Sequence, residues 1–135
     1  MTVLHAGEIF WLVPRNTRAP SRARALLREQ ATAWGIGTTP AEAAELLLSE
    51  LVTNAVRHSH APQGRDLGIR LARYGGLLRV EVADAGPAVK LTPQVVADTD
   101  ERGRGLAIVA ALAERWGQCP RLHGIGKAVW AEVRV

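Results

Sequence analysis

Cysteine and long apolar runs are both scarce in this chain. Cys119 is the single cysteine, so an internal disulfide is excluded, a cysteine-based metal site is not expected, and a reducing compartment fits. No apolar run approaches the roughly 18 residues that a membrane-spanning helix needs. Residues 1–13 have neither a basic stretch nor a cleavage-site pattern. We therefore expect no membrane span, no signal peptide and a cytoplasmic location.

Lysine is also rare, because fifteen of the seventeen basic residues are arginine. The formal net charge of +4 by itself suggests a nucleic-acid ligand. The arginines are, however, scattered through all the predicted elements. One cluster stands out and is interpreted as a solvated helix face: Arg15, Arg18, Arg22, Arg24 and Arg28. We expect no direct contact with nucleic acid, and DNA binding with a steep salt dependence would contradict this expectation.

The length and the remaining composition predict one globular domain. The chain has 135 residues, of which 47% are hydrophobic and 22% charged. These values are typical of a soluble protein that builds a core without disulfides. We find no internal repeat and no low-complexity segment.

Helical periodicity dominates the first half of the chain. Residues 8–13 predict a short strand, and residues 20–34 predict a helix that glycines terminate. A second helix is predicted to begin with Thr39 as its N-cap and Pro40 as its first helical residue. At about 100° per residue, five of its residues form a buried stripe: Ala44, Leu47, Leu48, Leu51 and Ala55.

Strand patterns are more frequent in the second half. Residues 67–73 and 77–83 predict two strands joined as a hairpin through Gly75-Gly76. The other predicted elements are a loop over 85–102, a helix over 105–116 with Gly117 after its end, and a final hairpin of 121–123 with 128–135. The predicted fold class is α+β, with helices on one face of a mixed, mostly antiparallel sheet.

Glu50 and Asn54 lie four residues apart near the end of the second helix, so both project from one face, a single turn apart. They fall on the shoulder of the buried stripe, where we expect them to line a cleft beside the core. The amide oxygen of Asn54 suits Mg²⁺, which takes oxygen ligands alongside phosphates. Glu50 is placed to deprotonate an attacking hydroxyl. The alternative is a solvated helix shoulder without chemistry.

Two glycine-containing segments follow. Asp84 ends a predicted strand next to Ala85-Gly86, so its carboxylate can accept a hydrogen bond from an exocyclic amine while the backbone approaches a flat ring. Gly103-Arg104-Gly105 opens a predicted helix, whose free N–H groups and positive dipole end favour phosphate. Taken alone, the first segment favours an ordinary strand-ending turn, and the two glycines of the second are a weak signal that an ordinary helix entry also explains.

In this order, the three segments resemble the ATP-binding superfamily of gyrase, the heat-shock chaperone, histidine kinases and mismatch-repair ATPases. Within it, the chain is similar to the stand-alone anti-sigma-factor serine kinases, especially the single-domain proteins common in actinobacteria. Residues 49–58 are close to the N-box of that family. Residues 102–106 and 113–117 are similar to its second glycine box and the following helix, and residues 126–130 to its closing strand.

The resemblance implies the Bergerat fold, a two-layer sandwich that holds Mg²⁺ and ATP between helices and sheet. It implies Glu50 as the general base, Asn54 as the Mg²⁺ ligand and Asp84 as the group that recognises the adenine amine. The other implied nucleotide contacts are Gly86, Gly103, Arg104, Gly105 and Leu106. Ala128 departs from the pattern, because many members carry a threonine there whose hydroxyl helps to hold adenine through water. The lost hydrogen bond predicts an ATP affinity about tenfold lower.

The function that the resemblance implies is a regulatory kinase. It would use Mg·ATP to phosphorylate a serine or threonine of an anti-anti-sigma-type antagonist, sequester a sigma factor and form a homodimer. The alternative is a non-catalytic ATP-binding or nucleotide-independent interaction module, which Ala128 and the lack of a further obvious catalytic residue favour. ATP-dependent binding of a partner would separate both from a nucleic-acid-binding protein.

Overall fold

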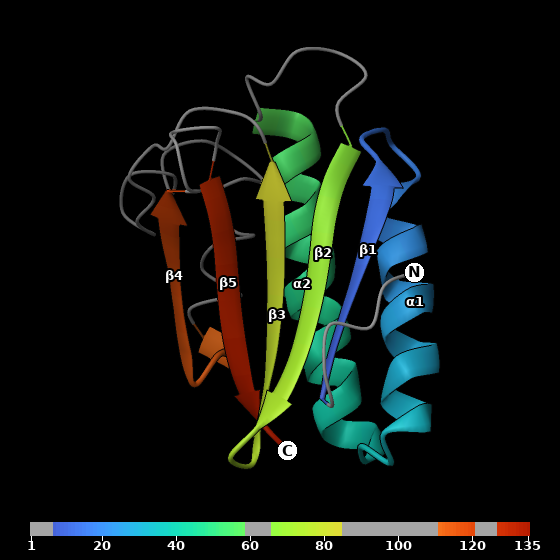
Figure 1. Ribbon diagram of the computed structural model, residues 1–135, viewed down its shortest axis with the longest axis vertical. Helices are drawn as coiled ribbons and strands as arrows, with labels where there is room; N and C mark the ends of the chain where they lie inside the picture. Colours follow the sequence, from blue (N-terminus) through green and yellow to red (C-terminus); the bar gives the residue numbers. More distant parts are fainter. Residues whose placement is uncertain (1–6, 59–65, 85–110, 121–126) are drawn as a thin grey trace.

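Two helices pack on one face of a five-stranded sheet. The computed structural model describes residues 7–58, 66–84, 111–120 and 127–135. The strand order is β1-β2-β3-β5-β4, and each of the described pairings is antiparallel. Figure 1 shows the two layers, with both helices behind the sheet. The predicted α+β fold with helices on one face of the sheet is confirmed.

The sheet consists of five short strands. Their bounds are β1 (Glu8–Pro14), β2 (Asp66–Tyr74), β3 (Leu77–Asp84), β4 (Arg115–Pro120) and β5 (Lys127–Arg134). In β3 every second residue is buried, because alternate side chains point toward the helix layer. The predicted hairpin of β2 and β3 is confirmed. Gly75 and Gly76 form its turn with φ of +53° and +76°, as a primed two-residue turn requires.

Helix α1 (Ala19–Ala33) ends where the glycine pattern predicts. Gly35 has a φ of +67°, which favours glycine because it has no Cβ. The N–H of Gly35 donates to the carbonyl of Thr32 at 3.1 Å, and the N–H of Ile36 donates to the carbonyl of Ala31 at 2.9 Å. These two bonds form a Schellman motif, which satisfies the last carbonyls of the helix.

Helix α2 (Thr38–His58) begins earlier than predicted. The N–H of Ala41 donates to the carbonyl of Gly37 at 3.0 Å, so Thr39 lies inside the first turn and is not the N-cap. Pro40 is tolerated there, because the first N–H groups of a helix have no partner within the helix. The predicted buried stripe is confirmed, with exposures of 0–8% at its five positions: Ala44, Leu47, Leu48, Leu51 and Ala55.

The core lies between the helix layer and the sheet. Its largest fully buried apolar side chains come from both layers: Leu27, Leu47, Leu48, Leu51, Val52, Leu67, Ile69, Leu71, Leu78 and Val13. Their burial drives the packing of the two layers, at roughly 1.5–3 kcal/mol for each large side chain. Within the described residues, no helix is long and apolar enough to cross a membrane.

The structure corrects the C-terminal part of the sequence-based assignment. A third helix was predicted over 105–116, but the described helical residues end at Leu112 and β4 begins at Arg115. Gly117 lies within β4, opposite Trp130 of β5. The partner of β5 is therefore β4 in place of residues 121–123, which lie outside the described residues. Pairing with β5 overrides the helical periodicity, because it satisfies the backbone of these residues along a whole strand.

Candidate functional site

Glu50 and Asn54 lie on the side of α2 that α1 leaves uncovered. Both are half-buried, as their place on the shoulder of the buried stripe predicts. The opposite shoulder of α2 contacts α1, since Arg24 donates to the Ser49 hydroxyl at 2.7 Å and Arg28 forms an ion pair with Glu45. At about 100° per residue, Glu50 and Asn54 point away from these contacts, so the fold places them outside the helix–helix interface.

Asp84 is a buried carboxylate at the last position of β3. Its exposed fraction is 3%, and it shares the alternation of Leu78, Val80 and Val82, whose side chains belong to the core. Asp84 therefore faces the helix layer. Acidic side chains are rarely buried so deeply unless they are paired or have a role.

Lys127 lies opposite Asp84 and was not among the predicted site residues. The two are paired in register at the start of β5, Lys127 is 7% exposed, and its Nζ lies 3.9 Å from Oδ2 of Asp84. This distance exceeds that of a direct hydrogen bond, but the positive charge still offsets part of the cost of burying the carboxylate. The sequence contained a usable signal, because Lys127 continues the alternation of Val129, Ala131 and Val133 toward the core.

The candidate residues of α2 and β3 belong to the same end of the molecule. The last turns of α2, the end of β3 and the start of β5 all lie at the top of Figure 1. The fold thus brings Asn54, near the end of α2, and Asp84, at the end of β3, to the same end of the interface between the helices and the sheet. Gly86, Gly103, Arg104, Gly105 and Leu106 lie outside the described residues.

Ala128 is buried, with an exposed fraction of 6%, and pairs with Ala83 of β3 and Cys119 of β4. Strand alternation places its side chain on the sheet face opposite to that of Asp84 and Lys127. The regular alternation of β5 therefore gives no direct contact between side chain 128 and Asp84. The predicted loss of affinity from the missing hydroxyl stays a prediction.

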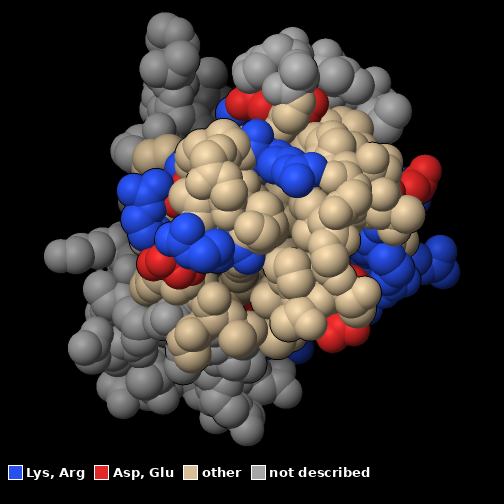
Figure 2. Space-filling view, turned by 90° about the horizontal axis from the view of Figure 1, so that it is seen from below, with Lys and Arg blue, Asp and Glu red and all other residues tan. Residues whose placement is uncertain are grey.

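Charges of opposite sign are interspersed at the opposite end of the molecule. Figure 2 looks at this end and shows basic groups beside acidic groups around a largely uncharged surface. Ion pairs neutralise part of the positive charge, such as those of Arg28 with Glu45 and of Arg134 with Glu114, the latter at 3.0 Å. The described residues form no continuous basic stripe at this end of the kind that binds nucleic acid.

The arrangement of the described residues fits a nucleotide. A buried carboxylate that faces the helix layer is an acceptor suited to an exocyclic amine, and the half-buried amide of Asn54 is a hard oxygen donor suited to Mg²⁺. A half-buried carboxylate one helical turn from that amide is suited to accept a proton. These groups come from segments that lie about thirty residues apart in the sequence, and the fold brings them to one end.

Comparisons with known proteins agree with this description. Residues 13–132 match the histidine kinase-like ATPase domain family. An uncharacterized protein of Streptomyces coelicolor is 43% identical over 70 residues, which cover 49% of this chain and 67% of that protein.

A solved structure shows the same fold. A crystal structure of the RsbU and RsbW domains of Rv1364c from Mycobacterium tuberculosis matches with a TM-score of 0.71 and 22% identity. The match covers 94% of this chain, which corresponds to about a third (32%) of that one. The Acinetobacter baumannii histidine kinase AdeS matches 93% of this chain and 67% of its own, at 16% identity and a TM-score of 0.48. The family match covers most of the chain, and its name gives ATP as the ligand class; the chain belongs to the histidine kinase-like ATPase domain family.

Proposed function

We propose that this protein is a Mg·ATP-dependent serine/threonine kinase that acts on a partner protein of the anti-anti-sigma type. The observation that carries the proposal is the buried Asp84, which faces the helix layer at the end of the molecule where α2 ends. In the same proposal, the unphosphorylated partner and a sigma factor compete for the protein in the cytoplasm. The structural similarity to a chain with an RsbW domain supports the fold on which the proposal rests.

Three side chains have assigned roles in the proposed site. Asp84 accepts a hydrogen bond from the exocyclic amine of adenine, and its burial excludes water that would compete for this bond. Asn54 holds Mg²⁺ through its amide oxygen, and the ion neutralises charge on the phosphates. Glu50 accepts the proton of the attacking serine or threonine hydroxyl, so that the oxygen can attack the γ-phosphorus in line with the departing ADP.

The remaining proposed contacts come from segments outside the described residues. Gly86 would allow the backbone to approach the adenine ring. Gly103, Arg104, Gly105 and Leu106 would contact the phosphates at the start of a helix.

A non-catalytic ATP-binding or nucleotide-independent module is the second candidate. Its support comes from the sequence pattern alone, because Ala128 replaces the threonine of many similar proteins, while the regular alternation of β5 gives side chain 128 no direct contact with Asp84. The two candidates differ in whether a phosphoryl group reaches the partner. The first requires Mg²⁺-dependent binding of ATP, which a nucleotide-independent module does not.

Isothermal titration with ATP, with and without Mg²⁺, tests the proposed site. Wild type should bind saturably and more tightly with Mg²⁺, whereas Asn54→Ala should lose the Mg²⁺-dependent part. Glu42→Ala is the matched control, because Glu42 is an exposed residue in the first turns of the same helix, far along α2 from Asn54. Absence of binding at millimolar ATP would contradict the proposal and favour the nucleotide-independent module.

A further inference from the structure

Lys127 and Asp84 form a buried pair of opposite charges on the side of the sheet that faces the helices. Their exposed fractions are 7% and 3%, and the strand register sets them directly opposite each other on β5 and β3. Helix α2 packs against both of these strands. Removing two charges from water often costs as much free energy as their attraction returns. Stability alone is therefore a poor reason for a buried pair at this position.

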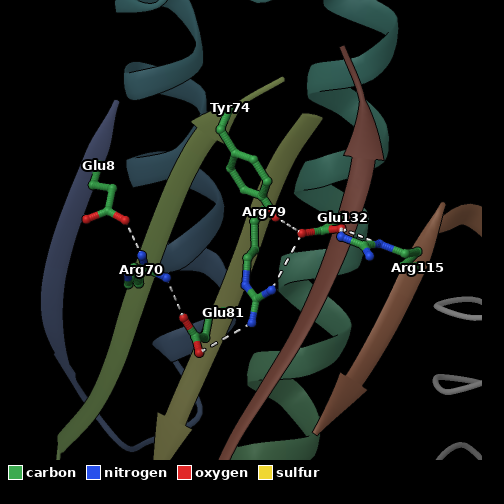
Figure 3. A network of polar contacts seen from close by, with 7 residues as sticks. All are labelled: Glu8, Arg70, Tyr74, Arg79, Glu81, Arg115 and Glu132. Atoms are coloured by element: carbon green, nitrogen blue, oxygen red, sulfur yellow. Dashed lines mark hydrogen bonds and ion pairs between the residues drawn. The ribbon is translucent and has the colours of Figure 1, made fainter. Parts of the chain in front are cut away.

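The ion pairs on the other face of the sheet are built in a different way. Figure 3 shows that network, which links three glutamates to three arginines in front of the helices. Arg70, for example, donates to Glu81 at 2.9 Å. This is the distance of a direct hydrogen bond, whereas Nζ of Lys127 lies 3.9 Å from Oδ2 of Asp84. The network thus uses arginine and direct hydrogen bonds between strands, and the pair of Asp84 and Lys127 has a different cation and a longer separation.

Lysine at position 127 departs from the usage of the rest of the chain. Fifteen of the seventeen basic residues are arginine. A guanidinium binds both oxygens of a carboxylate in a bidentate pair, so an arginine at this position would compete with a ligand of Asp84. An ammonium is a compact charge that carries three N–H donors. Lysine therefore places a charge and a donor beside Asp84 without covering both carboxylate oxygens.

The pair presents a hydrogen-bond acceptor and a hydrogen-bond donor side by side. One edge of adenine is complementary to it, because the amine donates and the neighbouring N1, bonded to the same carbon, accepts. Proteins that recognise a single base read this edge through such hydrogen bonds. In the same orientation, guanine has an acceptor oxygen opposite Asp84 and an N–H donor opposite Lys127, so both contacts would be mismatched.

We propose that Lys127 is a specificity-determining residue of the nucleotide site, where it donates a hydrogen bond to N1 of adenine while Asp84 accepts one from the amine. The inference rests on the proposed function, because it requires an adenine nucleotide at Asp84. Both residues lie at the end of the molecule where α2 ends, which is also the end that carries Asn54. Lys127 thus occupies the place beside Asp84 that side chain 128, on the other face of the sheet, does not reach.

Isothermal titration of wild type with two ATP analogues, in the presence of Mg²⁺, tests this contact. The analogue 1-deaza-ATP keeps the amine but has a C–H group in place of N1. It should bind at least about tenfold more weakly than ATP, the loss expected for a hydrogen bond from a charged donor. The matched control is 7-deaza-ATP, which keeps both N1 and the amine and should bind within about threefold of ATP, since neither hydrogen bond is lost. This comparison needs no variant, so it holds even if a substitution at position 127 disturbs folding.

Lys127→Met separates the contact from the packing of the side chain. Methionine keeps much of the apolar stem and removes the charge and the donors. The variant should bind ATP at least about tenfold more weakly than wild type and should no longer distinguish ATP from 1-deaza-ATP. Arg70→Met is the matched control, because Arg70 is a half-buried cation of the same sheet whose ion pairs lie on the other face. It should keep the wild-type ratio of the two affinities, and circular dichroism establishes that both variants are folded.

Failure of this inference and failure of the proposed function give different results. Absence of ATP binding in wild type would contradict the proposed function, and the inference would fail with it. Normal ATP binding with an equal affinity for 1-deaza-ATP would overturn the role of Lys127 and leave the proposed function standing. A Lys127→Met variant that still binds 1-deaza-ATP more weakly than ATP would also overturn that role, because another group would then contact N1.

Discussion

At the scale of single residues, Glu50 and Asn54 have separate roles in the proposed site: Glu50 accepts a proton and Asn54 binds Mg²⁺ with the nucleotide. They occupy the shoulder of α2 that α1 leaves uncovered, but only the proposed role of Asn54 involves the bound nucleotide directly. Glu50→Ala should therefore leave the affinity for Mg·ATP within about threefold and slow transfer to the partner by roughly 10²–10⁴. Titration calorimetry measures the affinity, and radiolabelled ATP measures the transfer.

The matched control for this change is Glu45→Ala, which removes another carboxylate of α2 on the side that contacts α1. It should leave transfer at the wild-type rate. A Glu50→Ala variant that transfers phosphate normally would remove Glu50 from the chemistry and leave the rest of the proposed site unaffected.

The ionisation of the Glu132 carboxylate affects the free energy of unfolding. Burial raises its pKa, but hydrogen bonds from Tyr74 and Arg115 and the charges of Arg115 and Arg79 outweigh this effect, so that the pKa lies below its ordinary value of 4.5. The ionised carboxylate therefore stabilises the fold above about pH 4.5, and this contribution is lost as the pH falls through the lower pKa of the folded state.

Glu132→Gln should lower the free energy of unfolding by about 1.5–3 kcal/mol at pH 7, the contribution of hydrogen bonds to a charged group. The difference from wild type should shrink as the pH falls through the acid range, because wild type then loses the same charge. Urea denaturation at pH 7 and at pH 3 measures both values. A difference that stays constant between these two pH values would show that packing, and not ionisation, is what the substitution disturbs.

At the scale of elements, the hairpin of β2 and β3 depends on its two turn glycines. Gly76 has a φ of +76°, where an alanine is strained by about 1–2 kcal/mol. Gly76→Ala should lower the free energy of unfolding by about this amount, measured by thermal or urea denaturation. Gly76→Asn is the matched control, because asparagine tolerates this conformation better, and it should cost less. Equal losses in both variants would mean that the positive φ is not the cause.

Elements with a strong local pattern could be predicted from the sequence, and those that depend on a distant partner could not. The stripe of α2 and the Gly75-Gly76 hairpin follow from periodicity and turn chemistry, which are local properties. Residues 115–116 continue a helical pattern in the sequence, but in the structure they begin strand β4. Their pairing with β5 decides their structure. The position of Asp84 could be predicted, whereas its pairing with Lys127 required the register of β5.

At the scale of the whole molecule, both surfaces of interest are assembled from segments far apart in the chain. The sheet face opposite to α1 and α2 takes its charged residues from all five strands, so no local pattern in the sequence indicates that Glu132 is buried or that these charges are paired with one another. The candidate nucleotide site takes its residues from α2, β3 and β5. Such a site exists only in the folded protein, and a ligand that binds there must raise the stability of the fold.

This linkage gives the last prediction, which concerns the proposed recognition of adenine by Asp84. Mg·ATP at about 100 times its dissociation constant should add about 2.7 kcal/mol to the free energy of unfolding, a rise of roughly 3–5 °C in Tm for each kcal/mol in a chain of this size. Mg·GTP should produce a smaller rise, because its ring carries an oxygen where adenine carries the amine, and two oxygen acceptors repel each other. Differential scanning fluorimetry measures each shift relative to the same variant without nucleotide.

Asp84→Asn should lose most of the rise with Mg·ATP, because an amide is a poorer partner for the amine than a buried carboxylate. Asp66→Asn is the matched control: Asp66 is exposed at the start of β2, at the same end of the sheet, so its rise should equal that of wild type. An equal rise with GTP and ATP, or an undiminished rise in Asp84→Asn, would place adenine recognition elsewhere. In that case the burial of Asp84 would serve the pairing of β3 with β5 through Lys127.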